Sequence, residues 1–195
     1  MIIGITGGTG CGKTTALRVI ESLGGVIIDC DRVYHDLLRT DMALCNAIEH
    51  RFPGTVKEGS LDRKALAAIV FSDEQALKDL NGITHGAVKR KVLEILHTKP
   101  ALVAIDAIEL FDGGLAEVCD VTVAVTAPED CRVERLVQRD QLTREQAAMR
   151  IGGQKAQAYF AEKCDYVLEN DSTQENFQEK CLAFFKELLT IKENT

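Results

Sequence analysis

Residues 7–14 read GGTGCGKT and match the nucleotide-phosphate loop pattern GxxxxGK(S/T). Glycines at these positions let the backbone fold so that successive N–H groups point inward at phosphate oxygens. The loop follows an apolar run, residues 2–6, that predicts a buried strand, and it leads into helical periodicity over residues 13–23. A chance glycine turn would lack this setting, so the motif predicts a nucleotide-binding α/β fold.

The residues of this loop predict ATP and Mg²⁺ as ligands. Lys13 would neutralise phosphate charge, and the Thr14 hydroxyl would bind Mg²⁺. A thiolate would be repelled by phosphate, so Cys11 is expected to be a neutral space-filler. A guanine-reading NKxD motif is absent, and the DxxG match at residues 79–82 falls in a helical stretch, which favours ATP over GTP. The ATP-binding residues predicted in the loop are Gly8, Thr9, Gly10, Cys11, Gly12, Lys13, Thr14 and Thr15.

The order of the remaining elements predicts a three-layer P-loop kinase fold of the α/β class. Strands and helices alternate, which is typical of a parallel sheet covered on both faces. The five strands are expected at residues 2–6, 26–29, 102–106, 121–125 and 166–168. The last helix is expected to bury Phe177, Cys181, Phe184, Leu188 and Ile191, and core positions are also expected for Phe52, Phe71 and Phe111.

Two segments interrupt this alternation and predict the domain organisation. Residues 32–99 are almost entirely helical, with one loop around Pro53 and Gly54, and predict a helical subdomain inserted after the second strand. Residues 129–163 are charged, contain no expected strand and predict a helical lid. The nucleotide-binding core would then comprise residues 1–31, 100–128 and 164–195.

Composition excludes some partners and compartments. A formal net charge of −7 disfavours binding to nucleic acid or an anionic membrane. No apolar run approaches the roughly 18 residues that span a bilayer, and the apolar start is expected to be a strand and not a signal peptide. Seven cysteines without a CxxC pair predict reduced thiols in a cytoplasmic protein, and the scattered cysteines and histidines suggest no dedicated metal cage.

Carboxylates at predicted strand ends are candidates for acceptor and metal chemistry. Residues 29–31, Asp-Cys-Asp, end the second strand, and strand alternation would place Asp29 and Asp31 on one side. A carboxylate there could accept the proton of a substrate hydroxyl, although capping of the next helix by Asp31 is an equal alternative. Asp106 ends the third strand and could orient Mg²⁺ through water, or it could simply begin a loop.

Three arginines in the predicted lid share one helix face. Arg132, Arg135 and Arg139 are spaced i, i+3, i+7. On an acidic chain, such a group suits a flap that closes over a triphosphate and stabilises charge in the transition state. The alternative is a solvated helix face with Glu129, Glu134 and Glu145 as partners of the arginines.

The order of several short segments resembles the dephospho-CoA kinase family over about residues 2–171. The phosphate loop alone is shared by many kinases, whereas the LDR and LNxIxH elements in this order are far more specific. The matching residues are 4–14, 23–24, 28–31, 59–63 with Leu66, 70–71, 80–85, Arg135 with 139–140, 150–151 with Gln154, Asp165 and Asn170.

This resemblance implies transfer of the ATP γ-phosphoryl group to the ribose 3′-hydroxyl of dephospho-CoA, yielding coenzyme A and ADP. Asp31 matches the catalytic base of the family, and Arg139 matches a lid arginine that reaches the ATP phosphates, with Arg135 beside it. Asn170 falls near the region that contacts adenine. The helical insertion resembles the substrate subdomain, and Asn81, His85 and Asp106 are expected on the acceptor side.

The chain departs from the family pattern at three places. Gly86 stands where proline is common, Phe160 where lysine is often found, and residues 108–110, Ile-Glu-Leu, where Pro-Leu-Leu is usual. Glu109 would repel a triphosphate unless it is paired or points to solvent. A nucleoside monophosphate kinase and an ATP-binding regulator on a decayed kinase scaffold are the alternatives, and retention of Asp31 and the LDR and LNxIxH elements argues against them.

Overall fold

A computed structural model describes residues 1–57, 60–98 and 100–193, so Gly59 of the family match lies outside the described residues. The chain forms two compact units. The first unit comprises Met1–Ile27, Pro100–Leu110 and Val118–Thr195, and the second comprises Ile28–Lys99 and Phe111–Glu117.

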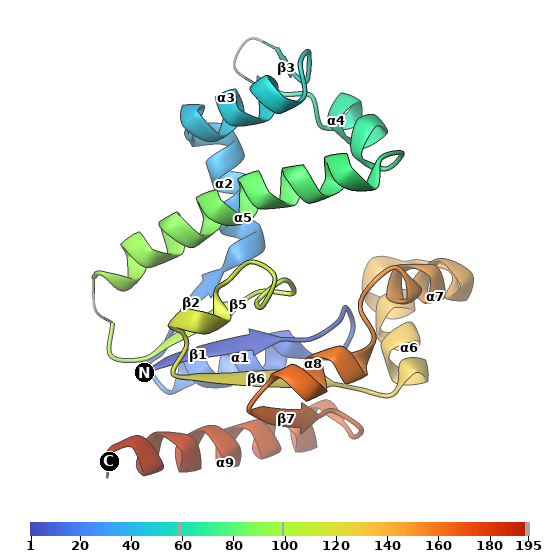
Figure 1. Cartoon of the computed structure of the whole chain (residues 1–195). Coiled ribbons are helices and arrows are strands. Elements are labelled where there is room, and N and C mark those ends of the chain that lie inside the picture. Colours follow the sequence, from blue (N-terminus) through green and yellow to red (C-terminus); the bar gives the residue numbers. More distant parts are fainter. Residues whose placement is uncertain (58–59, 99, 194–195) are drawn as a thin grey trace. The chain divides into compact units, whose positions relative to one another are not determined.

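Among the described residues, five strands form the main sheet in the order β2-β5-β1-β6-β7 (Figure 1). β1 pairs in parallel with β5 on one side and with β6 on the other, and β6 pairs in parallel with β7. Neighbouring strands are distant in sequence because each crossover returns over a face of the sheet. The predicted five-stranded parallel sheet is therefore confirmed. Its strands are β1 Ile2–Thr6, β2 Val26–Asp29, β5 Val103–Asp106, β6 Val121–Thr126 and β7 Tyr166–Glu169.

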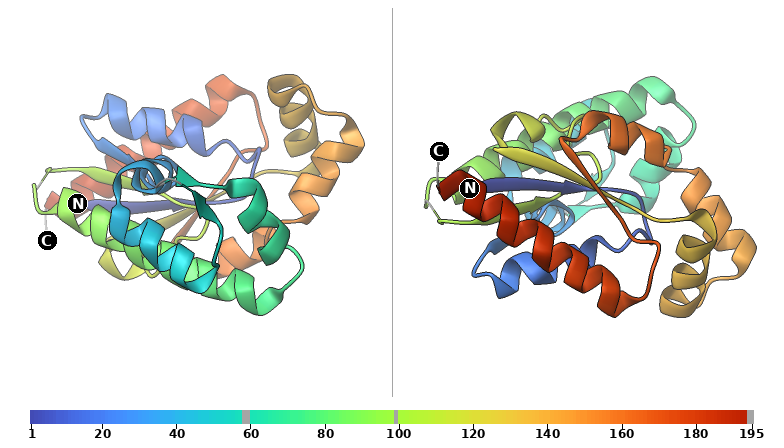
Figure 2. Two further views of the ribbon diagram at one scale, coloured as in Figure 1. Left: turned by 90° about the horizontal axis from the view of Figure 1, so that it is seen from above. Right: turned by 90° about the horizontal axis from the view of Figure 1, so that it is seen from below.

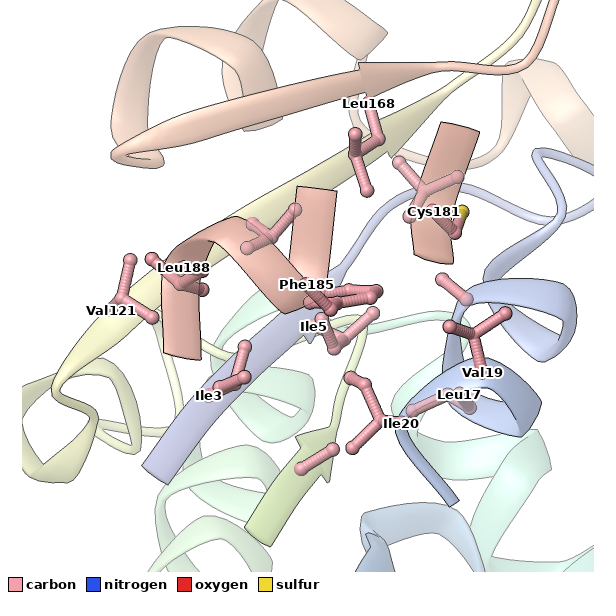
Figure 3. Close-up of a cluster of buried hydrophobic side chains, with 14 of the residues drawn as sticks. Ile3, Ile5, Leu17, Val19, Ile20, Val121, Leu168, Cys181, Phe185 and Leu188 are labelled. Atoms are coloured by element: carbon pink, nitrogen blue, oxygen red, sulfur yellow. The ribbon is translucent and has the colours of Figure 1, made fainter. Parts of the chain in front are cut away.

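Helices α1 (Lys13–Ser22) and α9 (Gln174–Glu193) pack against each other on one face of this sheet, and α8 (Gln157–Lys163) lies on the opposite face (Figure 2). Alternate residues of β1, Ile3 and Ile5, point toward the first of these faces and are completely buried. The surrounding core is shown in Figure 3 and includes Leu17, Val19, Ile20, Val121, Leu168, Cys181, Phe185 and Leu188.

The buried stripe of α9 differs in part from the prediction. Phe185 is buried where the neighbouring Phe184 was expected, and Ile191 is 55% exposed. Phe184 lies at the flank of the stripe, where its ring packs edge-to-face on Tyr166 of β7 at a centroid distance of 5.3 Å. The apolar periodicity located the helix face correctly, but only packing against β7 decided which aromatic ring became core.

The segment predicted as the lid forms α6 (Glu129–Asp140), α7 (Arg144–Gly152) and α8 within the first unit. A small apolar cluster joins α6 to α7. α7 begins with a capping box in which Thr143 and Gln146 satisfy each other's backbone N–H groups. After α8, the Asp165 carboxylate accepts hydrogen bonds from the backbone N–H and the hydroxyl of Thr122, which aligns β7 on β6. The buried members of the apolar cluster are Val133, Leu136, Ala147 and Ile151.

The second unit is mainly helical, and each of its helices begins after an aspartate whose carboxylate accepts backbone N–H bonds. Its helices are α2 Cys30–Thr40, α3 Met42–Arg51, α4 Arg63–Val70 and α5 Glu74–Leu96, capped by Asp29, Asp41, Asp62 and Asp73. A short turn of 3₁₀ helix, η1, spans Ala116–Val118.

Two expectations for this region were wrong. Two short antiparallel strands, β3 (Val56–Lys57) and β4 (Ser60–Leu61), occur where no strand was expected. The Glu49 carboxylate accepts the backbone N–H groups of Gly54 and Val56 at 2.7 Å and turns the chain into this pair. Phe71, expected in the core, is 87% exposed because it follows the last turn of α4.

Candidate active site

The phosphate loop connects β1 to α1 in the first unit, and its backbone requires glycine. Gly7, Gly10 and Gly12 have φ values of 139°, 77° and 103°, which L side chains rarely adopt. A Cβ atom on Gly7 would lie 2.2 Å from the carbonyl oxygen of Val125. One on Gly12 would lie 2.2 Å from the side-chain nitrogen of Asn170. Both conformation and close packing therefore exclude larger residues here.

Lys13 and the following threonines stand at the amino end of α1. The Lys13 ammonium donates to the carbonyl oxygen of Gly7 at 3.0 Å, which holds it across the loop. The Thr14 side chain is exposed, and the Thr15 N–H is bonded to the Gly12 carbonyl at 3.0 Å. Burial raises the pKa of Cys11, so its thiol is neutral near pH 7. The loop thus offers the Lys13 ammonium and the exposed Thr14 hydroxyl to a ligand, and the neutral Cys11 thiol adds no negative charge that would repel phosphate.

Two of the three predicted lid arginines contact this loop. Arg132 donates from Nε to the Thr9 carbonyl at 2.9 Å, and Arg135 donates from Nη1 to the Gly10 carbonyl at 3.2 Å. The third, Arg139, instead forms a bidentate pair with Asp140 at 2.7 and 2.9 Å. Hydrogen bonding to Arg139 holds the pKa of the Asp140 carboxyl below its usual range. Only Arg135 and Arg139 were singled out as ATP ligands, although the i, i+3, i+7 spacing also included Arg132.

Asn170 follows β7 and is 4% exposed. Its side-chain N–H₂ donates to the Cys11 carbonyl at 2.9 Å, and its side-chain oxygen accepts from Arg135 at 2.9 Å. Both ends of the amide are therefore used to connect the loop to α6. The amide still has a second N–H and a second oxygen lone pair, so the predicted contact with adenine does not require either bond to break.

Asp106 ends β5 next to the strand that leads into the loop. It stands opposite Ile5 in the parallel register and is partly buried. No cluster of three or more histidine, cysteine, aspartate or glutamate residues suited to a metal occurs in the described part of the chain. The Thr14 hydroxyl and the Asp106 carboxylate are nonetheless hard oxygen donors, which suit a Mg²⁺ ion that keeps its waters and nucleotide phosphates as further ligands.

In the second unit, a cavity of about 530 Å³ opens at the start of α2. Asp29 is the N-cap of this helix, and its Oδ1 atom accepts the Arg32 N–H at 2.9 Å. Asp31 lies in the first helical turn, so the expectation that Asp29 and Asp31 alternate along a strand was wrong. The capping role considered for Asp31 belongs to Asp29. The residues lining the cavity are Asp29, Asp31, Arg32, His35, Asp36, Arg39 and Arg63.

The lining of this cavity combines carboxylates with arginines. Arg63, from the LDR element, contacts Nδ1 of His35 at 3.1 Å, and Arg39 pairs with Asp36. Arginine N–H groups can only donate, so Nδ1 of His35 is the acceptor in this contact. Arg32, His35 and Arg39 were not among the predicted site residues. Once α2 is known to begin at Cys30, the i+4 and i+8 spacing of His35 and Arg39 from Asp31 was a signal that could have found these two residues.

Two other predicted acceptor residues lie on α5. Asn81 and His85 are one helical turn apart and partly buried, and the lining of the cavity does not include them. The structure therefore groups Asp31 with the α2 arginines and keeps Asn81 and His85 on a separate helix of the same unit.

The structure accounts for the departures at Glu109 and Phe160 and shows no requirement for glycine at position 86. Glu109 is half-exposed, and its carboxylate lies 3.4 Å from the Lys155 ammonium. It is thus both paired and solvated, the two conditions under which its charge is tolerated. Leu110 and Phe160 are completely buried and serve as core residues, while a Cβ on Gly86 would meet only the tip of Arg90 at 3.8 Å.

The described helices include none that is long and apolar enough to cross a membrane. The sequence model of the family described as dephospho-CoA kinase matches residues 1–176. The chain belongs to the dephospho-CoA kinase family. The dephospho-CoA kinase of Geobacillus kaustophilus is 33% identical to it over 193 residues, which is 96% of each chain. That of Halalkalibacterium halodurans is 30% identical over 200 residues and covers 100% of both.

Solved structures agree with membership of the dephospho-CoA kinase family. The Thermus thermophilus protein TT1252 has a TM-score of 0.79 and 33% identity over 96% of this chain and 97% of its own. A dephospho-CoA kinase from Campylobacter jejuni has a TM-score of 0.69 and 26% identity, covering 100% and 98%. A shikimate kinase from Bacteroides thetaiotaomicron, 16% identical with a TM-score of 0.56, shares the fold alone. The chain is thus a kinase of the P-loop type, and the resemblance found in its sequence is confirmed.

Proposed function

We propose that this chain uses ATP to phosphorylate dephospho-CoA at the ribose 3′-hydroxyl and releases coenzyme A and ADP. The observation that carries the proposal is a phosphate loop with Lys13 across it and α6 arginines bonded to it, in a chain that matches the dephospho-CoA kinase family over residues 1–176. The loop supports nucleotide binding, and family membership supports the choice of acceptor.

The nucleotide would be held by the loop N–H groups, Lys13 and the amino end of α1. Thr14 would hold Mg²⁺ directly and Asp106 through water, and the ion would neutralise charge on the phosphates. Arg135 already lies on the loop, and Arg139 would join it by exchanging Asp140 for a phosphate oxygen, since its side chain is exposed. Asn170 is proposed to reach the adenine side of the same site.

The acceptor would be held by the second unit. Asp31 is proposed as the general base that removes the 3′-hydroxyl proton while that oxygen attacks the γ-phosphorus in line with the departing ADP. Arg32 and Arg63 line the same cavity, and guanidinium groups suit the diphosphate of dephospho-CoA. Asn81 and His85 would contact the acceptor from α5.

The predicted domain roles follow from this assignment. Residues 32–99 would form the acceptor-binding subdomain, and residues 129–163 would form a lid that excludes water from the reacting phosphoryl group. The bonds from Arg132 and Arg135 to the loop support a lid that engages the nucleotide site.

An ADP-release assay with a panel of acceptors tests the proposal. Turnover is expected with dephospho-CoA and not with AMP, CMP or adenosine. Phosphorus NMR of the product should show a 3′-phosphomonoester, and the product should resist periodate because the ribose cis-diol is gone. Turnover only with a nucleotide would indicate a nucleoside monophosphate kinase, and ATP binding without any turnover would indicate a regulator.

A further inference from the structure

The buried guanidinium of Arg132 has a donor that the protein itself does not satisfy. Arg132 lies on α6 and is 3% exposed. Its Nε bonds to the Thr9 carbonyl, but its Nη2 is buried and has no hydrogen-bond partner among the described residues. A buried cationic donor without an acceptor is costly, so its retention at this position calls for an anion that the chain does not contain.

The position of this unsatisfied nitrogen is set by Gly8 and Gln154. A Cβ placed on Gly8 would lie 2.5 Å from Nη2 of Arg132 and 3.2 Å from Oε1 of Gln154. The same Gln154 oxygen accepts the Thr9 N–H at 2.7 Å. A neutral amide oxygen therefore accepts the hydrogen bond of one loop N–H group, and this oxygen and Nη2 both lie within 3.2 Å of the position that a Cβ on Gly8 would take.

Loop N–H groups of this kind are the ones that hold phosphate oxygens. A phosphate oxygen is charged and is a stronger acceptor than the side-chain oxygen of Gln154. It would therefore displace that oxygen from the Thr9 N–H and, at the same place, provide an acceptor for Nη2. The phosphates nearest the ribose are expected at residues 10–14, close to the amino end of α1. Thr9 lies on the side of the loop nearer β1, where the terminal phosphate is expected.

We propose that Arg132 is a further phosphate-binding residue of the nucleotide site, whose Nη2 and the Thr9 N–H together hold an oxygen of the terminal phosphoryl group of ATP once Gln154 is displaced. The inference rests on the proposed function, because it takes ATP as the ligand. Burial lowers the pKa of Arg132, and the Glu129 carboxylate offsets part of this shift.

Binding of ATP and ADP to full-length variants, without acceptor, tests the inference by calorimetry in Mg²⁺. Arg132→Met removes the guanidinium, and Arg18→Met removes an exposed arginine of α1 as a matched control. Loss of Nε will loosen the loop for both nucleotides, so the informative readout is the ratio of the two Kd values. Because a charged hydrogen bond to the terminal phosphate is lost only for ATP, Kd(ATP)/Kd(ADP) should rise about tenfold or more in Arg132→Met. It should stay unchanged in Arg18→Met.

An unchanged ratio in Arg132→Met would overturn the inference, whatever happens to the separate affinities. If thermal melting shows that this variant does not fold, Arg132→Lys replaces it. Lysine keeps the positive charge but lacks the planar guanidinium with its two parallel N–H donors, so Kd(ATP)/Kd(ADP) should still rise by about threefold or more. Gln154→Ala tests the displacement step and should bind ATP at least as tightly as the wild type; a tenfold loss would make Gln154 itself the ligand. Failure of the wild type to bind either nucleotide would instead refute the proposed function.

Discussion

Replacement of Asn170 by alanine separates a structural role of this residue from a role in adenine recognition. The structure gives its side chain two hydrogen bonds, to the Cys11 carbonyl and from Arg135, each at 2.9 Å. Each bond contributes about 1 kcal/mol net, more where the partner is charged. The Cys11 carbonyl keeps only a long contact from Arg135 at 3.5 Å, so it would be poorly satisfied after the substitution.

The combined loss is about 2–3 kcal/mol of stability in the absence of any nucleotide. For a chain of this size, that corresponds to a fall in Tm of roughly 4–12 °C. Differential scanning fluorimetry of the nucleotide-free protein measures it, with the exposed neighbour Asp171→Ala as control, which should shift Tm by less than about 2 °C. Weakened ATP binding is expected as well, because the loop loses its link to β7.

A nucleotide-free Tm within about 1 °C of the wild type would refute this reasoning. If such a variant also bound ATP weakly, the side chain would act on the nucleotide directly, as a contact with adenine requires. The Tm change in the empty protein therefore tests the structural role alone, because no nucleotide contact contributes to it.

Four further outcomes are expected. Asp31→Asn should lower kcat by about 100-fold or more while calorimetric ATP affinity persists, because only the general base is lost; unchanged kcat would remove Asp31 from the mechanism. Lys13→Ala should weaken ATP binding and turnover together, and normal turnover would contradict the role of the loop. Burial raises the pKa of Cys119 to about 12 and of Cys164 to about 11, so both thiols should be protonated at pH 8. Ellman's reagent should then label them faster in guanidinium than in the native chain, and equal rates would contradict the protection. Since these folded-state pKa values lie above the ordinary 9.0, the associated stability should be complete below pH 9 and decline as the pH rises toward 12.

Much of the fold followed from local pattern. Residues 2–6 and 26–29 were predicted as strands, and β1 and β2 have these bounds. Buried parallel strands are continuous apolar runs and are easy to recognise. The two-residue strands of the second unit were missed because so short a pairing depends on Glu49 holding the turn, which no local periodicity reveals.

The candidate site was predictable to a different degree in its two parts. The loop residues could be identified because phosphate binding by backbone N–H groups imposes its own spacing and glycine pattern. Strand alternation failed at Asp29, because an N-cap begins the helix at Cys30 and rotates Asp31 into its first turn. The i, i+3, i+7 spacing of the α6 arginines could not show that Arg132 would be buried on the loop and Arg139 paired with Asp140.

The sequence by itself determined the phosphate loop, the parallel sheet and the kinase family, because each is recognised from short local segments and from the order of those segments along the chain. Only the tertiary structure decided that Asn170 and Arg132, more than a hundred residues from the loop, bond to its carbonyl groups. It also decided that Glu109 pairs with Lys155 and that Phe160 is core. Burial and hydrogen-bond partners arise from long-range packing. The role of a side chain therefore depends on its neighbours in the folded structure, which can be far from it in the sequence.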